Sequence, residues 1–228
     1  MLKMIKLDWL GMKVYHKRFV IIPLGICLLG FISELFIIPM TAFYMLSFSV
    51  NPFAVEEKGK LDHLYMTMPI TRKNVVNARF GLSLIMLAAG LVFSIAATVI
   101  FAKALYGKNF LYIHAFTADY KTILLLVCGA LFLYALINLS TFPILFKLGY
   151  ARGRALGFYI PVGFFVSLVY VVYLFVEYNS AFGKWFNASL TWAAENVMFA
   201  ALYALLAAAA ALAASYALSQ KLFSRREF

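Results

Sequence analysis

The sequence predicts an all-α membrane protein with six transmembrane helices, an N-terminal interfacial helix and a short cytoplasmic helix between the second and third spans. Hydrophobic residues make up 65% of the 228 residues and charged residues 13%, about half the charged share of soluble domains. Several apolar runs approach the roughly 20 residues with which a helix crosses a bilayer. The polar segments between the runs hold most of the basic residues, as cytoplasmic loops do.

Composition also excludes several classes of function. The net charge of +11 would suggest a nucleic-acid partner for a soluble protein, but in a membrane protein it follows from lysine and arginine in cytoplasmic loops, so no nucleic acid is expected. Cys27 and Cys128 lie in apolar runs without disulfide or metal-ligand spacing. His16, His63 and His114 are scattered along the chain. We therefore expect no catalytic residue, no metal and no cofactor in this chain.

Residues 1–18 are predicted to form the interfacial helix. Leu2, Ile5, Trp9 and Met12 recur at helical spacing with lysines around them, which is typical of a basic amphipathic helix in the headgroup region. The alternative is a frayed polar segment that leads into the first span.

The apolar run 19–50 is predicted to hold helices 1 and 2. It is long for one helix and short for two, and Glu34 and Pro39 lie near its middle, where a turn between two helices is expected. With two crossings here, 16 of the 20 basic residues fall on the side of both termini. This asymmetry satisfies the positive-inside rule and places both termini in the cytoplasm.

The later spans are predicted as helix 3 at 80–102, helix 4 at 122–146, helix 5 at 155–176 and helix 6 at 194–219. External loops are expected at 103–121 and 177–193, and a short internal loop at 147–154. Residues 1–228 therefore form a single transmembrane domain, in which 51–79 is the cytoplasmic segment between helices 2 and 3.

That segment contains VEEKGKLDHLYMTMPITRKNVV, residues 55–76, in which charges of both signs crowd together. Leu61, Leu64, Tyr65 and Met68 stand at i, i+3, i+4 and i+7, which predicts one apolar face of a short helix.

Pro69 is expected to end this short helix because it lacks the amide donor. Thr71 can then cap a second helix that leads into the third span. One interpretation is a connector whose apolar face rests on lipid. However, Glu56, Glu57 and Asp62 favour a protein partner, because helices on lipid surfaces are usually basic.

The run MPITRKNVVNARF, within residues 66–80, resembles the region between the second and third helices of ABC-2 type transporter permeases. The outline of the whole chain, an interfacial helix and six spans with both ends inside, is similar to that family too. Within it, the likeness is to small bacterial permeases that export amphipathic peptides, such as phenol-soluble modulin and antimicrobial peptide exporters. The resemblance implies a multi-pass protein of the bacterial cell membrane.

The resemblance also implies a mechanism. The segment between helices 2 and 3 would be a coupling helix that docks on a separate ATP-binding cassette ATPase subunit, which carries ATP and Mg. This chain has no Walker-type G-x-x-x-x-G-K-[ST] and is not expected to be an enzyme. It would act with a second permease subunit, as a homodimer or with a similar permease, and move an amphipathic or hydrophobic cargo such as a peptide outward. The implied ATPase-coupling residues are Glu56, Glu57, Lys60, Leu61, Leu64, Tyr65, Pro69 and Arg72.

Helix 5 of this family often contributes to the permease dimer interface. Gly149, Gly153 and Gly157 repeat every four residues at its entry, a spacing that allows close helix contact. Gly153, Gly157 and Pro161 are thus candidate dimer contacts, with a flexible loop as the alternative.

Two polar or small-residue clusters lie within later spans. The alanine-rich run 205–215 is expected to pack within the subunit. Asn138, Ser140 and Thr141 either face a cargo path or bond to nearby backbone carbonyls, and we favour the second.

Two other functions were weighed against the permease. An ATP-independent secondary transporter or channel usually carries ionisable residues within its spans, and apart from Glu34 this sequence has none at mid-membrane. An intramembrane enzyme would need paired carboxylates, H-E-x-x-H or an activated nucleophile, and none is found.

Overall fold

The computed structural model describes residues 2–12, 16–28, 36–59, 71–105, 120–178 and 180–224, and every element in these ranges is a helix. This confirms the all-α class. The elements are α1 (Leu2–Gly11), α2 (His16–Cys27), α3 (Ile37–Ser49), α4 (Asn51–Gly59), α6 (Arg72–Leu105), α7 (Tyr120–Arg154), the π-helical turn η4 (Ala155–Tyr159), α8 (Ile160–Tyr178), α9 (Ser180–Glu195) and α10 (Val197–Ser224).

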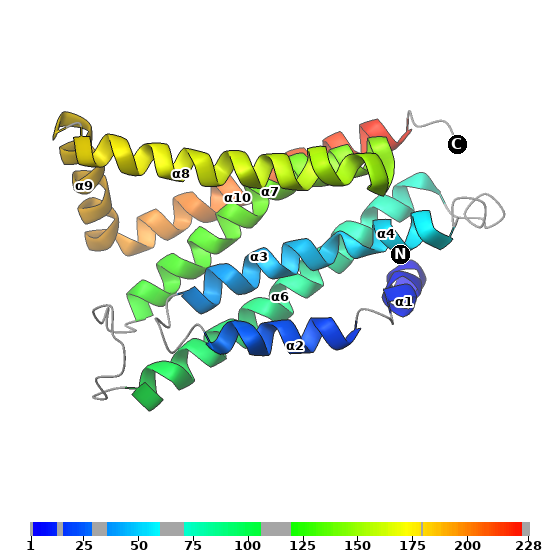
Figure 1. The fold of residues 1–228 in the computed structure, drawn as a ribbon, viewed down its shortest axis with the longest axis horizontal. Coiled ribbons are helices and arrows are strands. Elements are labelled where there is room, and N and C mark those ends of the chain that lie inside the picture. Colours follow the sequence, from blue (N-terminus) through cyan, green and yellow to red (C-terminus); the bar gives the residue numbers. More distant parts are fainter. Residues whose placement is uncertain are drawn as a thin grey trace.

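Four helical segments of the described ranges are long and apolar enough to cross a membrane. They are Ile37–Glu57, Lys73–Phe101, Tyr120–Gly153 and Val197–Ser224. The helices α2 and α8, of 12 and 19 residues, also run along the long axis of the bundle (Figure 1). The four segments support a polytopic membrane protein, while the total of six spans stays a prediction.

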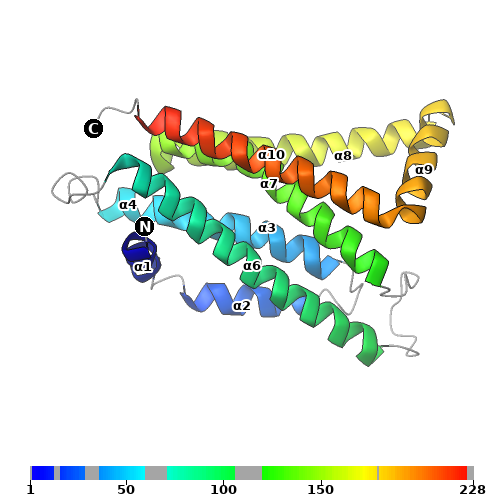
Figure 2. The same cartoon turned by 180° about the vertical axis from the view of Figure 1, so that it is seen from behind.

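The helices α7 and α10 pack side by side and run in the same direction (Figure 2). Ser215 of α10 lies beside Asn138 of α7, and Phe223 lies beside Phe146 eight residues further along both helices. Small side chains on the buried face of α10, at Ala208 and Ser215, allow this close approach. Ala208 and Ser215 are buried against the rest of the chain, whereas most of the alanine-rich run 205–215 is exposed. The expectation that this run packs within the subunit therefore holds only for its buried face.

Polar side chains inside the bundle divide between two kinds of hydrogen bond. The hydroxyls of Ser140 and Thr141 donate to the carbonyl of Ile137 on their own helix, as expected. Asn138 behaves differently, because its side-chain oxygen accepts a hydrogen bond from Ser215 Oγ at 3.0 Å. It therefore joins two helices.

Short helices lie across the two ends of the bundle, α1 at one end and α9 at the other (Figure 1). Met4 of α1, Val76 near the start of α6 and Phe223 near the end of α10 belong to one buried cluster. The first and last described helices therefore meet at the same end of the molecule.

Two segments predicted as loops are helical. Residues 147–154 continue α7 to Arg154, with a break at Gly149, where φ of 76° departs from helical geometry. Most of the expected external loop, 177–193, lies in α9 (Ser180–Glu195), an amphipathic helix without proline. The sequence prediction failed for both because it treated any polar interval between apolar runs as a connection. Most of the other expected loop, 103–121, lies outside the described residues.

Candidate functional site

The site begins where the second apolar segment leaves the bundle. The helix α4 continues α3 almost without interruption, and the amide of Phe53 bonds the carbonyl of Val50 at 3.1 Å. Phe53, Glu56 and Glu57 follow at i, i+3 and i+4, so they lie close together on α4. The predicted cytoplasmic segment 51–79 thus starts as a helix, and its second part begins α6 at Arg72.

The entry to α6 has the predicted cap. The amide of Asn74 contacts Thr71 Oγ1 at 3.3 Å, which satisfies a donor that the first turn of a helix leaves open. Two turns further along, Arg79 points into the bundle, and it is only 2% exposed.

Arg79 forms a buried ion pair with Glu56. Its Nη2 lies 2.5 Å from Glu56 Oε2, and the two side chains are 2% and 6% exposed. The guanidinium also lies 4.2 Å from the ring centroid of Phe53 and 5.7 Å from that of Phe146, which adds cation–π attraction. A charge buried at this depth requires a partner, and the pair therefore joins α4, α6 and α7 at one point.

A further buried ionisable side chain comes from α1. Asp8 of α1 is 5% exposed and lies on the same helical face as the buried Met4 and Met12. Burial raises the pKa of the Asp8 carboxyl above its ordinary value, and the positive charge of Arg79 partly offsets this. Its Oδ2 has no hydrogen-bond partner among the residues that the structure describes. The helix α1 is thus tied electrostatically to Arg79.

Glu57 makes a second connection, to the entry of the fifth predicted span. Its Oε2 accepts a hydrogen bond from the amide of Ala151 at 2.7 Å. The break at Gly149 frees the amides that follow it, and the carboxylate binds one of them as a cap does at a helix N-terminus. The acidic pair therefore contacts α6 through one residue and the α7–α8 corner through the next.

Aromatic side chains surround the charged contacts. Phe80, Phe142, Phe146 and Phe223 come from α6, α7 and α10, and their rings contact one another in tilted, stacked and edge-to-face pairs. Such pairs add about 0.5–1.5 kcal/mol each beyond the area they bury. These phenylalanines belong to one buried apolar cluster beside the ion pair.

Only part of the predicted coupling set lies in the described ranges. Glu56 and Glu57 take the places given above, and Arg72 begins α6, although its side chain lies outside what the structure describes. Lys60, Leu61, Leu64, Tyr65 and Pro69 lie outside the described residues. The acidic pair was expected to face a partner, whereas the structure brings both carboxylates onto groups of the same chain.

The glycines proposed as dimer contacts pack within the chain. A Cβ on Gly153 would lie 3.2 Å from Leu145 Cα, and one on Gly157 would lie 3.2 Å from the Thr141 carbonyl oxygen. The chain folds back on α7 after Gly149, and these glycines permit the close approach. Pro161 is the second residue of α8, directly after the π-helical turn. A role of these three residues between subunits stays a prediction.

Sequence reasoning missed Asp8 and Arg79. Arg79 was counted among the basic residues inside, but it stands in the run VVNARFGLSL, which is otherwise apolar or small. A charge placed within such a run is costly in a membrane and must be paired. That isolation was a usable signal, although it does not reveal which carboxylate is the partner.

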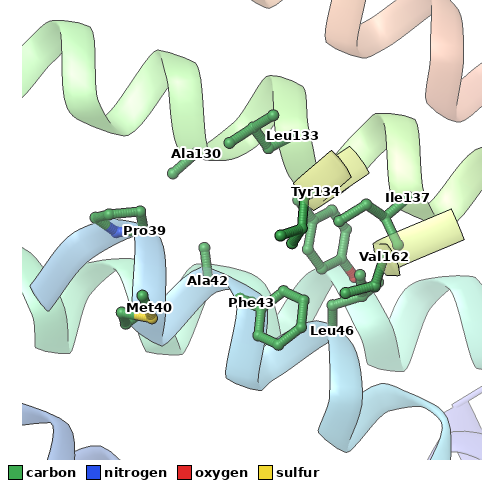
Figure 3. A pocket seen from close by; sticks show the side chains of 11 residues that line it. Pro39, Met40, Ala42, Phe43, Leu46, Ala130, Leu133, Tyr134, Ile137 and Val162 are labelled. Atoms are coloured by element: carbon green, nitrogen blue, oxygen red, sulfur yellow. The ribbon is translucent and has the colours of Figure 1, made fainter. Parts of the chain in front are cut away.

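An apolar hollow of about 280 Å³ opens deeper in the bundle, among α3, α7 and α8 (Figure 3). Phe43 and Leu46 line it from α3, Tyr134 and Ile137 from α7, and Val162 from α8. No charged side chain lines it, so it suits an apolar group.

Apolar spans with a charged junction at one end define a polytopic helical membrane protein. The model of the family described as ABC-2 family transporter protein matches residues 3–224. The chain therefore belongs to the ABC-2 family and is a permease subunit of an ABC transporter, which confirms the resemblance seen in MPITRKNVVNARF. No curated protein and no solved structure matches the chain.

Proposed function

We propose that this permease works in an exporter, and that an ATPase subunit docks at the end of the bundle where α1, α4 and the start of α6 meet. The observation that supports this most is the double connection of the acidic pair. Glu56 contacts Arg79 of α6, and Glu57 contacts the amide of Ala151 at the α7–α8 corner. A displacement of the segment that follows α4 would therefore pull on three helices together.

In this proposal the docking surface lies after α4, at Lys60, Leu61, Leu64, Tyr65 and Pro69, with Arg72 at the entry to α6. ATP and Mg bind to the partner ATPase. In this proposal the buried pair does not recognise the partner but transmits its movement, because it joins α4 to α6 inside the bundle.

The proposed topology has six spans with both termini in the cytoplasm. Met4 and Phe223 meet in one cluster, which requires an even number of passes between them. The helices α2 and α8 supply the two passes beyond the four long apolar segments, and the positive-inside rule then assigns this end to the cytoplasm. A second permease subunit completes the transporter.

The proposed cargo is amphipathic or hydrophobic, such as a peptide. The hollow among α3, α7 and α8 supports this, because its lining is apolar (Figure 3). Val166 lines the hollow and is 62% exposed, so Val166→Trp should narrow it without disturbing the core. We expect reduced transport, whereas Val171→Trp, at an exposed position of α8 outside the hollow, should transport normally. Equal transport by both variants would exclude the hollow from the path.

Co-purification tests the docking proposal. The tagged chain is expressed with its genomic neighbours, and an ATPase subunit should co-purify with it at one-to-one. Leu61→Glu combined with Leu64→Glu places two charges on the face that the sequence predicts to be apolar, and should abolish this association. Ser189→Glu on the exposed face of α9 is the matched control and should retain the ATPase. A homo-oligomer that never carries an ATPase would instead favour an ion-driven transporter.

A further inference from the structure

A second hollow lies at the charged end of the bundle and is lined by the first turns of α6 and the last turns of α10. Figure 2 shows these two helix ends near each other. It measures about 340 Å³, within the range of about 300–1,000 Å³ that is usual for small-molecule sites. Its lining residues are Lys73, Val76, Ala217, Gln220, Lys221, Phe223 and Ser224. The hollow is separate from the Glu56–Arg79 pair and from the apolar hollow of Figure 3.

The rim of this hollow is basic. Lys73 and Lys221 are both exposed and approach it from different helices. Within the described ranges neither lysine takes part in an ion pair. The buried ion pair of this end joins two other residues, Glu56 and Arg79. Two ammonium groups facing one opening attract an anion from opposite sides.

A hydrogen-bond chain fixes the wall behind the rim. Gln220 Nε2 donates to the Tyr216 hydroxyl, which donates to Asn77 Oδ1 at 2.7 Å. This chain joins α10 to α6 and so links the two helix segments that carry Lys73 and Lys221. The hollow is therefore a formed feature of the helix pair.

The floor of the hollow is apolar and continues toward the interior of the spans. Val76, Ala217 and Phe223 form the floor. On α10 the exposed Ala213 and Ala214 stand four and three residues before Ala217, on the same helical face. Below the basic rim, α10 thus presents a shallow strip of alanines that a hydrocarbon chain can follow.

The hollow lies at the ends of two helices that are long and apolar enough to cross a membrane, one described from Lys73 and the other up to Ser224. Basic side chains at such helix ends attract anionic lipids. A free anion would need only the rim, whereas the apolar floor and the alanine strip require a ligand with acyl chains.

We propose that this hollow binds the phosphate headgroup of an anionic phospholipid. Lys73 and Lys221 bind the phosphate, and the acyl chains lie over Ala217 and the alanine strip of α10. The site does not depend on the direction of transport, on the cargo or on the ATPase. Its ligand chemistry is a phosphodiester, which the lipid and not the solvent supplies.

Native mass spectrometry of the detergent-solubilised permease tests the proposal with dioleoyl phosphatidylglycerol, with dioleoyl phosphatidylcholine and with inorganic phosphate alone. Each surface lysine contributes about fivefold to the affinity for an anionic membrane lipid. Lys73→Gln with Lys221→Gln should therefore weaken phosphatidylglycerol binding by about 25-fold and leave phosphatidylcholine unchanged. Lys103→Gln with Lys147→Gln removes two exposed lysines outside the hollow and should change neither lipid.

Ala217→Trp distinguishes a lipid from a free anion. Ala217 is exposed, so the indole fills the floor while both lysines remain. Phosphatidylglycerol binding should fall as in the lysine variant. Three results would overturn the proposal: unchanged phosphatidylglycerol binding in the Lys73 and Lys221 variant, an equal loss in the Lys103 and Lys147 variant, or inorganic phosphate that binds with the same lysine dependence and is unaffected by Ala217→Trp.

Discussion

The helices α1 and α9 both lie across an end of the bundle, but they are held in different ways. The helix α1 buries Met4, Asp8 and Met12 on one face, at 5%, 5% and 0% exposure. The helix α9 exposes both of its tryptophans, Trp185 at 63% and Trp192 at 48%. One helix is part of the protein core, and the other presents its aromatic side chains outward, as helices in a membrane interface do.

The two ends of the bundle therefore differ in how firmly buried contacts hold their short helices. At the α1 end, α1, α4, α6, α7 and α10 meet around a buried ion pair and a set of phenylalanines. These contacts join all five helices at that end. At the α9 end, the described side chains make far fewer buried contacts, so α9 can move with the lipid surface or with α8.

The largest effect that separates the two ends should come from the buried ion pair. Glu56→Gln leaves the Arg79 guanidinium buried without its carboxylate, which should lower the free energy of unfolding by about 3–5 kcal/mol. Glu195→Gln, an exposed change on α9, should stay within about 0.5 kcal/mol. Denaturant unfolding in a mild detergent measures both. Similar decreases in the free energy of unfolding for both variants would show that the two ends do not differ in this way.

Replacing the pair as a whole should restore stability. Glu56→Met with Arg79→Met substitutes apolar groups of similar length for both charges, and such exchanges are often neutral or stabilising. If the double variant were as unstable as Glu56→Gln, the attraction between the two charges would add more to the free energy of unfolding than their desolvation costs.

A smaller effect is expected from the apolar contacts of the two short helices. Met12→Ala removes a side chain that is fully buried and should cost about 2–3 kcal/mol. Trp185→Ala should change the unfolding free energy by no more than about 0.5 kcal/mol, while weakening the attachment of α9 to the bilayer. Fluorescence quenching of Trp192 by lipid-bound quenchers would report the second change. If Met12→Ala were as mild as Trp185→Ala, α1 would also be a surface helix.

Asp8 should give the smallest effect, one that depends on pH. Burial raises the pKa of its carboxyl above 3.8, so the folded protein binds a proton more tightly than the unfolded chain. Stability should therefore fall as pH rises from about 3.8 through the raised pKa, and stay level above it. Asp8→Asn removes that slope and leaves stability at neutral pH equal or higher. The same slope in the variant would assign it to another group.

Much of the fold could be predicted from local features, and the candidate site could not. Apolar runs located the long helices, and Thr71 was correctly predicted as a cap. The partner of Glu56 is 23 residues away along the chain, and no periodicity connects two residues on different helices. The fold-back at Gly149 was missed because a glycine in a basic segment has the same pattern whether it lies in a loop or breaks a helix.

We infer that the acidic pair carries movement from the proposed ATPase docking site into the membrane helices. Spin labels at positions 147 and 184, in a cysteine-free background of the reconstituted permease–ATPase complex, measure the distance between the α7 corner and α9. We predict that ATP shifts this distance in the wild type. In Glu57→Ala, the ATPase should still bind and hydrolyse ATP while the distance stays fixed. An unchanged ATP-dependent shift in Glu57→Ala would contradict the claim.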